Sequence, residues 1–220
     1  MAAKSPAKLK KEDQFISFWK RVYGFYDQHQ KQFLAGLAGL VVAAAAVWGW
    51  IAFQNHLQAK AWDEYEAVLA EFSSKTGGQD QALKALSDII DRHPGTKAGD
   101  QARLEMAALA AHEGDFELAV KYYLAFWDSL KPDDPLRPAV ADALGHCFEA
   151  QGKFDEAAQW YATVTKNPRL ADLGLWNLAR VQELSGQRQL AAETYRRLLT
   201  EHPDSVYVSL ANDRLIDLEG

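Results

Sequence analysis

The sequence predicts an all-α protein in which one N-terminal transmembrane helix precedes a solenoid of helix pairs. An uncharged apolar run, FLAGLAGLVVAAAAVWGWIAF, fills residues 33–53 of a chain whose mean hydropathy is -0.30. Beyond residue 60 no long stretch alternates as a strand would, and Gly- or Pro-containing turn signals recur instead. Two later segments also match at a fixed spacing. We therefore expect about four helix pairs and a C-terminal capping helix.

Residues 1–31 are predicted to form a basic, amphipathic cytoplasmic segment, disordered over the first eleven residues. The segment holds seven Lys/Arg and three Asp/Glu, whereas the rest of the chain holds 17 basic and 27 acidic residues. Apolar side chains recur with helical spacing and give one aromatic face beside two cations. They are Phe15, Phe18, Trp19, Val22 and Tyr26, beside Lys20 and Arg21. Such a helix suits a lipid interface, and a partner-bound or transient helix is the alternative.

The apolar run is long enough to cross a bilayer, since a helix of about 21 residues is about 32 Å long. A buried core helix and a cleaved secretory signal are the alternatives. The run has no polar stripe, which argues against the first, and it stays apolar through WGWIAF, which argues against the second. We predict a permanent anchor over residues 32–54. Its membrane side chains are Phe33, Leu37, Leu40, Val41, Trp48, Trp50, Ile51 and Phe53.

The flanking charges predict the orientation of the anchor. Seven basic residues precede the apolar run 33–53, while only Lys60 and Lys75 occur in the thirty residues after Phe53. Because the basic flank stays in the cytoplasm, residues 55–220 are expected in the periplasm of a bacterium, attached to its inner membrane. Our hypothesis is that the anchor helix continues into the first repeat helix, since no break signal separates them.

The periplasmic region repeats with a period of 34 residues. The matched pairs are Leu144/Leu178, Glu149/Glu183, Gly152/Gly186, Ala157/Ala191, Ala158/Ala192 and Tyr161/Tyr195. Two helices in a unit of this length are the signature of the tetratricopeptide repeat (TPR). Small residues such as Gly145 let the two helices cross closely, and Tyr161 fills the space that remains. Gly152 ends the first helix, where a positive φ is needed.

The same template predicts two earlier and more degenerate units. The expected limits are about 63–96, 100–131, 138–171 and 172–205, with a cap at 206–220. In the first unit Gly77 is the turn glycine and Leu86 replaces the aromatic residue. The second unit begins 38 residues before the third, and the connection KPDDPLRP accommodates the four extra residues. The cap covers the apolar face that the last unit would otherwise expose.

The sequence predicts no catalytic residue, no metal and no cofactor. The six His residues are scattered, and no second pair with zinc-ligand spacing follows His146 and Cys147. Cys147 is interpreted as a small buried residue, with a reactive thiol as the alternative. An acidic body also argues against nucleic-acid binding. An enzyme with an undetected site is the remote hypothesis.

A TPR solenoid binds proteins along the face formed by its first helices. The predicted groove residues are Leu104, His112, Asp142, His146, Glu149, Leu173, Trp176, Asn177, Arg180 and Glu183, together with Gln101 and Ala108. Trp176 beside Arg180 is either an anchor for a partner or a packing residue. Modules that grip a C-terminal carboxylate use a clamp rich in Lys and Asn, which only Asn177 and Arg180 resemble here.

The order of elements resembles the bacterial inner-membrane family of ancillary Sec-translocon subunits. A basic segment, the anchor, the helix AWDEYEAVLAEF and then TPRs follow one another over nearly the whole chain. The resemblance implies translocon subunits, periplasmic chaperones and emerging client chains as partners, and no small-molecule substrate. HPDSVYVSLANDRL is similar to an element of TPR proteins in envelope assembly. A TPR adaptor in outer-membrane or cell-wall assembly is therefore the alternative.

Overall fold

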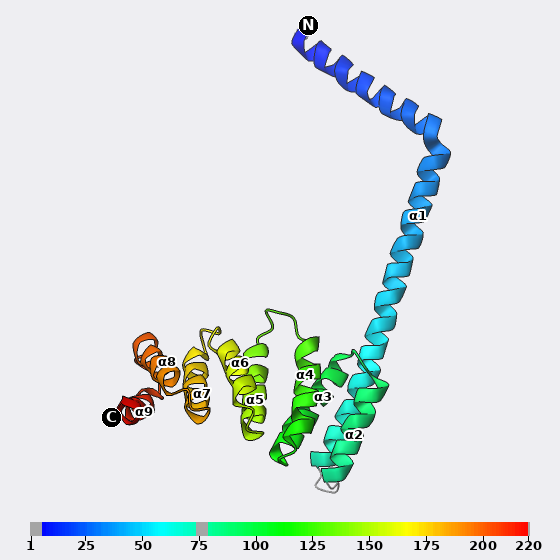
Figure 1. Ribbon diagram of the computed structural model, residues 1–220. Coiled ribbons are helices and arrows are strands. Elements are labelled where there is room, and N and C mark those ends of the chain that lie inside the picture. The colour runs from blue at the N-terminus through cyan, green and yellow to red at the C-terminus, as the bar shows by residue number, and fades with distance from the viewer. Residues whose placement is uncertain (1–5, 74–78, 220) are drawn as a thin grey trace. The chain divides into compact units, whose positions relative to one another are not determined.

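A computed structural model describes residues 6–73 and 79–219, with side chains at 17–27, 29–70 and 81–219. In these ranges every regular element is an α-helix (Figure 1). The helices are α1 (Pro6–Ser73), α2 (Gln79–Arg92), α3 (Lys97–His112), α4 (Phe116–Ser129), α5 (Arg137–Ala150), α6 (Phe154–Val164), α7 (Ala171–Leu184), α8 (Arg188–Glu201) and α9 (Val208–Glu219). The chain divides into two compact units, Met1–His56 and Leu57–Gly220, and α1 contributes residues to both.

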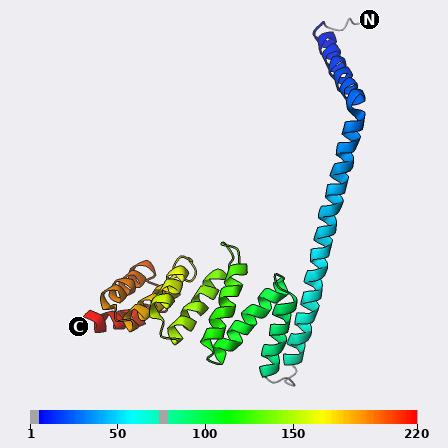
Figure 2. The ribbon, with the colours of Figure 1, turned by 45° about the vertical axis from the view of Figure 1, so that its right-hand side comes forward.

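The first unit consists of helix α1 up to His56. Helix α1 begins at Pro6, so the expectation of disorder over residues 1–11 is wrong from that point on. The local sequence PAKLKKE consists mostly of Ala, Leu, Lys and Glu, which are good helix formers. Within α1 only His29 departs from helical geometry, with φ -118° and ψ 18°, and the ribbon bends there (Figures 1 and 2).

The apolar part of α1 is not covered by the chain. Residues 29–70 are long and apolar enough to cross a membrane, and the most apolar window in this range is 0% buried. The eight predicted anchor side chains lie within it and are each about half exposed or more, up to 74% at Trp48. The alternative of a core helix buried by this chain is therefore wrong, and α1 remains a candidate membrane anchor.

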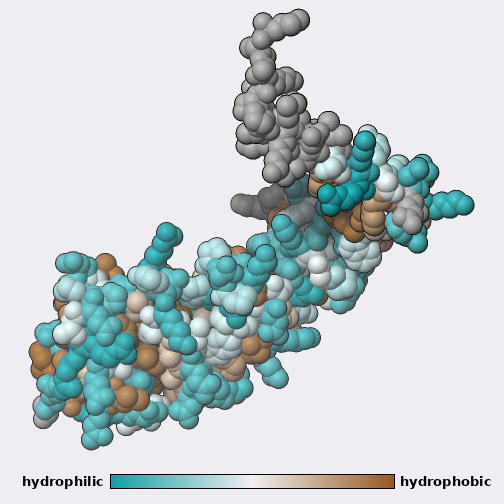
Figure 3. Space-filling view, turned by 90° about the horizontal axis from the view of Figure 1, so that it is seen from above, coloured by the Kyte–Doolittle hydropathy of each residue, from teal (hydrophilic) through white to brown (hydrophobic). Residues whose placement is uncertain are grey.

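The second unit is a solenoid, as the sequence predicts. From α2 to α9 each helix packs against the next one along the chain (Figures 1 and 2). This nearest-neighbour packing is the defining feature of a repeat solenoid. Hydrophilic side chains cover much of its visible surface, with scattered hydrophobic residues between them (Figure 3). The unit limits set from the sequence stay a prediction, and Gly77 lies outside the described residues.

Glycines set the close approach and the turns of the helix pairs. Gly152 and Gly186, which follow α5 and α7, have φ values of 73° and 80°, so the predicted positive φ is confirmed. At Gly145 an added Cβ would lie 2.5 Å from Cε1 of Tyr161. A side chain at this position would therefore collide with the Tyr161 ring, which is why α5 and α6 need a glycine where they cross.

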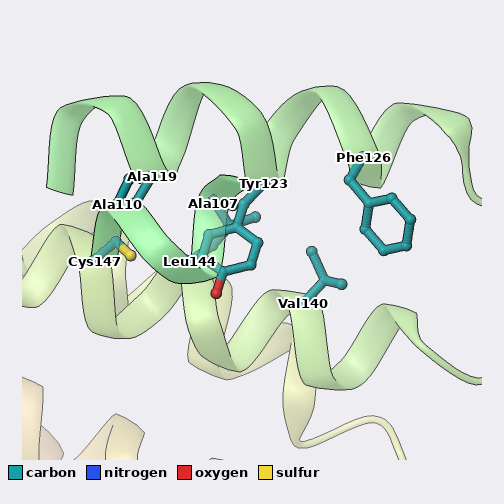
Figure 4. Close-up of a cluster of buried hydrophobic side chains, with 8 residues drawn as sticks. All are labelled: Ala107, Ala110, Ala119, Tyr123, Phe126, Val140, Leu144 and Cys147. Carbon is teal, nitrogen blue, oxygen red and sulfur yellow. The ribbon is translucent and has the colours of Figure 1, made fainter. Parts of the chain in front are cut away.

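In each core cluster, alanines and aliphatic side chains pack around one or two aromatic rings. Figure 4 shows the cluster of α3, α4 and α5, in which Tyr123 fills the space beside Ala107, Ala119 and Leu144. Cys147 belongs to the same cluster, and burial raises the pKa of its thiol to about 11. The thiol is therefore protonated near neutral pH, which fits a packing residue better than a reactive one.

Helix α9 caps the solenoid only in part. Ala211 is fully buried against α7 and α8, and Leu215 and Leu218 pack beside it. On the outer side, Leu210 is 52% exposed and Ile216 is 62% exposed. The cap therefore covers the apolar face of the last helix pair, as expected, but presents apolar side chains of its own.

Candidate protein-binding face

A cluster of paired polar side chains joins α5, α6 and α7. At its centre, the Glu149 carboxylate accepts hydrogen bonds from both terminal nitrogens of Arg180, with Nη2 2.8 Å from Oε2. The Tyr161 hydroxyl donates to the same Oε2 at 2.8 Å. The planar guanidinium and the carboxylate thus form a bidentate contact, which makes the ion pair strong and directional. We call this set the first rung.

Three further side chains extend the first rung. Asn177 is 3% exposed, and its Nδ2 donates to Oδ1 of Asp142 at 2.9 Å. His146 Nδ1 lies 2.9 Å from the Tyr161 hydroxyl, and its Nε2 lies 3.4 Å from Oδ2 of Asp142. Because the single hydroxyl proton of Tyr161 goes to Glu149, His146 Nδ1 must be the donor to Tyr161. The His146 side chain is 51% exposed, so it presents a polar edge to solvent.

The first rung is charged and fully paired. Burial raises the pKa of Glu149, but the hydrogen bonds from Arg180 and Tyr161 outweigh it and lower that pKa overall. Burial, helped by the Glu149 carboxylate, raises the pKa of Tyr161. The pair therefore stays ionised near neutral pH, and it leaves no free base or nucleophile. Among the described residues no three His, Cys, Asp or Glu side chains are placed to hold a metal ion.

A second, looser rung lies 34 residues further along the chain. The Tyr195 hydroxyl donates to Oε2 of Glu183 at 3.3 Å, and Arg214 Nη1 lies 3.8 Å from Oε1 of Glu183. Each residue occupies the position of its counterpart in the first rung, one period later. The repeat thus encodes a ladder of Glu, Tyr and Arg in successive helix pairs.

The structure brings together five of the predicted groove residues in and around the first rung. They are Asp142, His146, Glu149, Asn177 and Arg180. Asn177 and Arg180 are thereby engaged with carboxylates of their own chain, so they do not form a carboxylate clamp. The sequence assigned Tyr161 and Tyr195 only a space-filling role and did not single out Arg214. The repeated spacing of Arg180 and Arg214 is the signal that would have found the ladder.

The other predicted groove residues lie apart from the first rung. Trp176 stacks on Tyr207, with ring centres 5.6 Å apart and planes 8° apart, which supports its interpretation as a packing residue. Leu104 packs against the core cluster of α3 to α5. The His112 side chain is 82% exposed beside Glu113. Of the rest, Leu173 is half-buried and Glu183 belongs to the second rung.

A pocket that the sequence did not predict lies beside the connection KPDDPLRP. It encloses about 380 Å³ between the α4–α5 and α6–α7 connections. Prolines line much of it, and the guanidinium of Arg137 lies 3.7 Å from the ring centre of Trp127. The connection that accommodates the four extra residues therefore also shapes a surface pocket.

Comparison with known proteins identifies the type of repeat. A family model described as a tetratricopeptide repeat-like domain matches residues 24–167, and a tetratricopeptide repeat model matches residues 143–206. Lipopolysaccharide assembly protein B of Escherichia coli strain K12 is 21% identical over 178 residues, which are 79% of this chain and 45% of that protein. The general transcriptional corepressor ssn6 of Schizosaccharomyces pombe is 27% identical over 130 residues, which are 57% of this chain and 11% of that protein. The chain thus spans less than half the length of either relative.

Solved structures show the same fold. The nearly identical TPR-like repeats of a Podosopora anserina protein described as a kinesin light chain superpose with a TM-score of 0.54 and 15% identity, over 73% of this chain and 86% of that one. MamA protein superposes with a TM-score of 0.53 and 14% identity, over 73% of this chain and 85% of that one. At these identities the likeness concerns the TPR-like fold alone.

Proposed function

Because the chain belongs to the tetratricopeptide repeat-like domain family, we propose that it is a membrane-anchored scaffold that binds proteins at the periplasmic surface of a bacterial inner membrane. One observation carries the proposal: the same chain joins TPR-like helix pairs to helix α1, which has a long uncharged segment whose side chains stay exposed. Repeat solenoids bind through extended surfaces, and an exposed apolar helix of this length needs lipid around it. The basic N-terminal flank supports the orientation.

Within this function, we favour an ancillary subunit that links the Sec channel to periplasmic chaperones and emerging clients. The order of elements supports it, because a single span would hold the repeats beside the channel exit. The exposed edges of His146 and His112 are the proposed partner contacts. Trp176 is not among them, since it is packed against Tyr207.

An adaptor in outer-membrane or cell-wall assembly is the second candidate. The observation in its favour is the 21% identity to lipopolysaccharide assembly protein B over 79% of this chain. Both candidates are protein-binding scaffolds with the same fold, and they differ only in the partner that is held.

Photo-crosslinking of the full chain in its native membrane separates the two candidates. We would place a photoreactive residue at Leu40 in the anchor, at His146 beside the first rung, or at the exposed Gln159 of α6 as the matched control. The first candidate predicts translocon subunits at Leu40 and chaperones or clients at His146. Envelope-assembly factors at both sites would support the second. His146 adducts no stronger than those of Gln159 would exclude this face as the binding surface.

A further inference from the structure

We infer that residues 18–28 of α1 form a second membrane-contacting element, a helix that lies along the anionic cytoplasmic surface of the bilayer and turns into the anchor at His29. The inference rests on the proposed anchor, but the anchor does not require it. Four observations carry it: an exposed aromatic arc, cations at the edges of that arc, a bend at the right place, and an apolar hollow in the bend.

The aromatic arc covers one side of the helix. With 3.6 residues per turn, six apolar side chains follow one another around an arc of about 160°. In order around the helix they are Phe25, Phe18, Val22, Tyr26, Trp19 and Tyr23. Their exposed fractions run from 39% at Tyr26 to 70% at Tyr23, so the chain itself does not cover the arc. A surface of this width and aromatic content suits the boundary between head groups and acyl chains.

Basic side chains flank the aromatic arc. In the same projection, Arg21 lies about 40° beyond Phe25, and Lys20 lies about 60° beyond Tyr23 at the other edge. Lys31 follows the bend, and Asp27 is the acidic residue of the polar side. When the arc is embedded, these cations lie at head-group level, where an anionic leaflet attracts them.

The bend at His29 gives the helix the turn that it needs. A surface helix and a spanning helix cannot share one straight axis, and α1 leaves helical geometry only at this residue. His29 Nδ1 lies 3.0 Å from Oε1 of Gln32, and the rings of Tyr26 and Phe33 meet across the bend at 5.5 Å. These contacts join the two helical segments, so the bend is a built feature of α1.

The hollow in the bend is apolar and continues the arc. It encloses about 500 Å³, and Val22, Phe25 and Tyr26 of the arc line it together with Phe33 at the start of the anchor. The arc and the anchor therefore share one apolar surface, which acyl chains can cover without a break.

Membrane is favoured over a protein as the occupant of this surface. The arc is joined to the anchor through His29, so the bilayer is present at a high effective concentration whenever the anchor is inserted. A protein partner would have to be recruited and would displace this contact. The edge cations match anionic lipid in sign.

The test is a depth measurement on the full chain in vesicles. An environment-sensitive dye is attached to Val22→Cys, near the centre of the arc, or to Gly24→Cys on the polar side, where an added Cβ has open space. The vesicles contain about three parts phosphatidylglycerol to seven parts phosphatidylcholine, with nitroxide-labelled lipid as quencher. Unsubstituted protein gives the background from Cys147, which is buried. We expect strong quenching at position 22 and little at position 24.

Charge variants and the anchor separate the possible outcomes. Lys20→Gln with Arg21→Gln should lower the equilibrium constant for binding of this helix to the membrane surface about 30-fold, at about fivefold per cation. Lys20→Arg with Arg21→Lys should leave that constant unchanged, since both charges remain. Equal quenching at positions 22 and 24, with a dye at Leu40→Cys still quenched, overturns the inference but leaves the anchor intact. Loss of quenching at position 40 overturns both. Quenching at position 22 that requires added cytosolic protein shows a protein partner and also overturns the inference.

Discussion

The two rungs occupy the same positions in successive helix pairs, yet they differ in strength. In the first rung, Tyr161 and Arg180 both reach Glu149 at 2.8 Å. In the second, the corresponding distances to Glu183 are 3.3 Å and 3.8 Å. The arginines differ in the same sense, because the Arg180 side chain is 25% exposed and that of Arg214 is 47% exposed.

The neighbours of each rung explain the difference. Asn177 holds Asp142 next to the first rung, but one period later these positions are occupied by Ala211 and Trp176, which cannot repeat that contact. Arg180 also lies on α7, which packs between α6 and α8, whereas Arg214 lies on the terminal helix α9. The repeat determines which side chains meet, and packing on both sides of the helix determines how tightly they meet.

Removal of the central carboxylate of the first rung should have the largest effect. Glu149→Ala leaves the buried Tyr161 hydroxyl without its acceptor and half-buried Arg180 without its counter-charge. We expect a loss of about 2–4 kcal/mol in the free energy of unfolding. Urea unfolding of the full chain in mild detergent measures it, with the exposed Glu193→Ala on α8 as control. An equal loss in both variants would contradict the assignment of Glu149 to a stabilising cluster.

The next largest effect is expected at Gly145, against which the Tyr161 ring packs. The residue before His146 is Gly145, whereas one period later the same position is Ala179 and tolerates a Cβ beside its own tyrosine. Gly145→Ala should lower the free energy of unfolding by about 1–3 kcal/mol, because the new methyl group overpacks against the ring. The higher helix propensity of Ala should offset up to about 1 kcal/mol of this loss. Thermal unfolding measures the net loss. A stabilised Gly145→Ala variant would show that the Tyr161 ring moves freely, in conflict with its fixed hydrogen bond.

Acid should weaken the first rung by a smaller amount, since a protonated carboxyl still accepts a hydrogen bond. The pKa of Glu149 is lowered in the folded chain from its ordinary value of 4.5. Its contribution to stability is therefore complete above about pH 4.5 and is lost as the pH falls through the folded value. Glu149→Gln should show a shallower loss of stability below that pH. If the free energy of unfolding fell equally steeply with pH for the unsubstituted protein and for Glu149→Gln, this prediction would be contradicted.

Regular spacing made much of the fold predictable. The uncharged run and the 34-residue period predicted an apolar helix followed by helix pairs, and Gly152 and Gly186 adopt the expected positive φ. These features depend on local sequence, because periodicity and turn residues act within one helix or one connection.

Contacts between distant side chains were less predictable. Trp176 stacks on Tyr207, which lies 31 residues further along the chain and cannot be predicted as its neighbour from the local sequence. The bend in α1 falls at His29, although Gly24 is the nearby residue with the weaker helix propensity and stays helical. Spacing places a residue on a face, but the crossing of helices decides which neighbour takes its hydrogen bond.

The smallest effect should come from the second rung. The Glu183 side chain is 24% exposed, its contacts are long, and solvent reaches nearly half of Arg214. Such exposed pairs contribute little because water screens them and ordering a long side chain costs entropy. Glu183→Ala also removes the acceptor of the buried Tyr195 hydroxyl, but that hydrogen bond is long, at 3.3 Å. We therefore expect a loss of about 1 kcal/mol in the free energy of unfolding, less than for Glu149→Ala. Double-mutant cycles of Glu149 with Arg180 and of Glu183 with Arg214 compare the rungs directly. Equal coupling energies would mean that the repeat alone, and not the neighbouring helices, sets the strength of each rung.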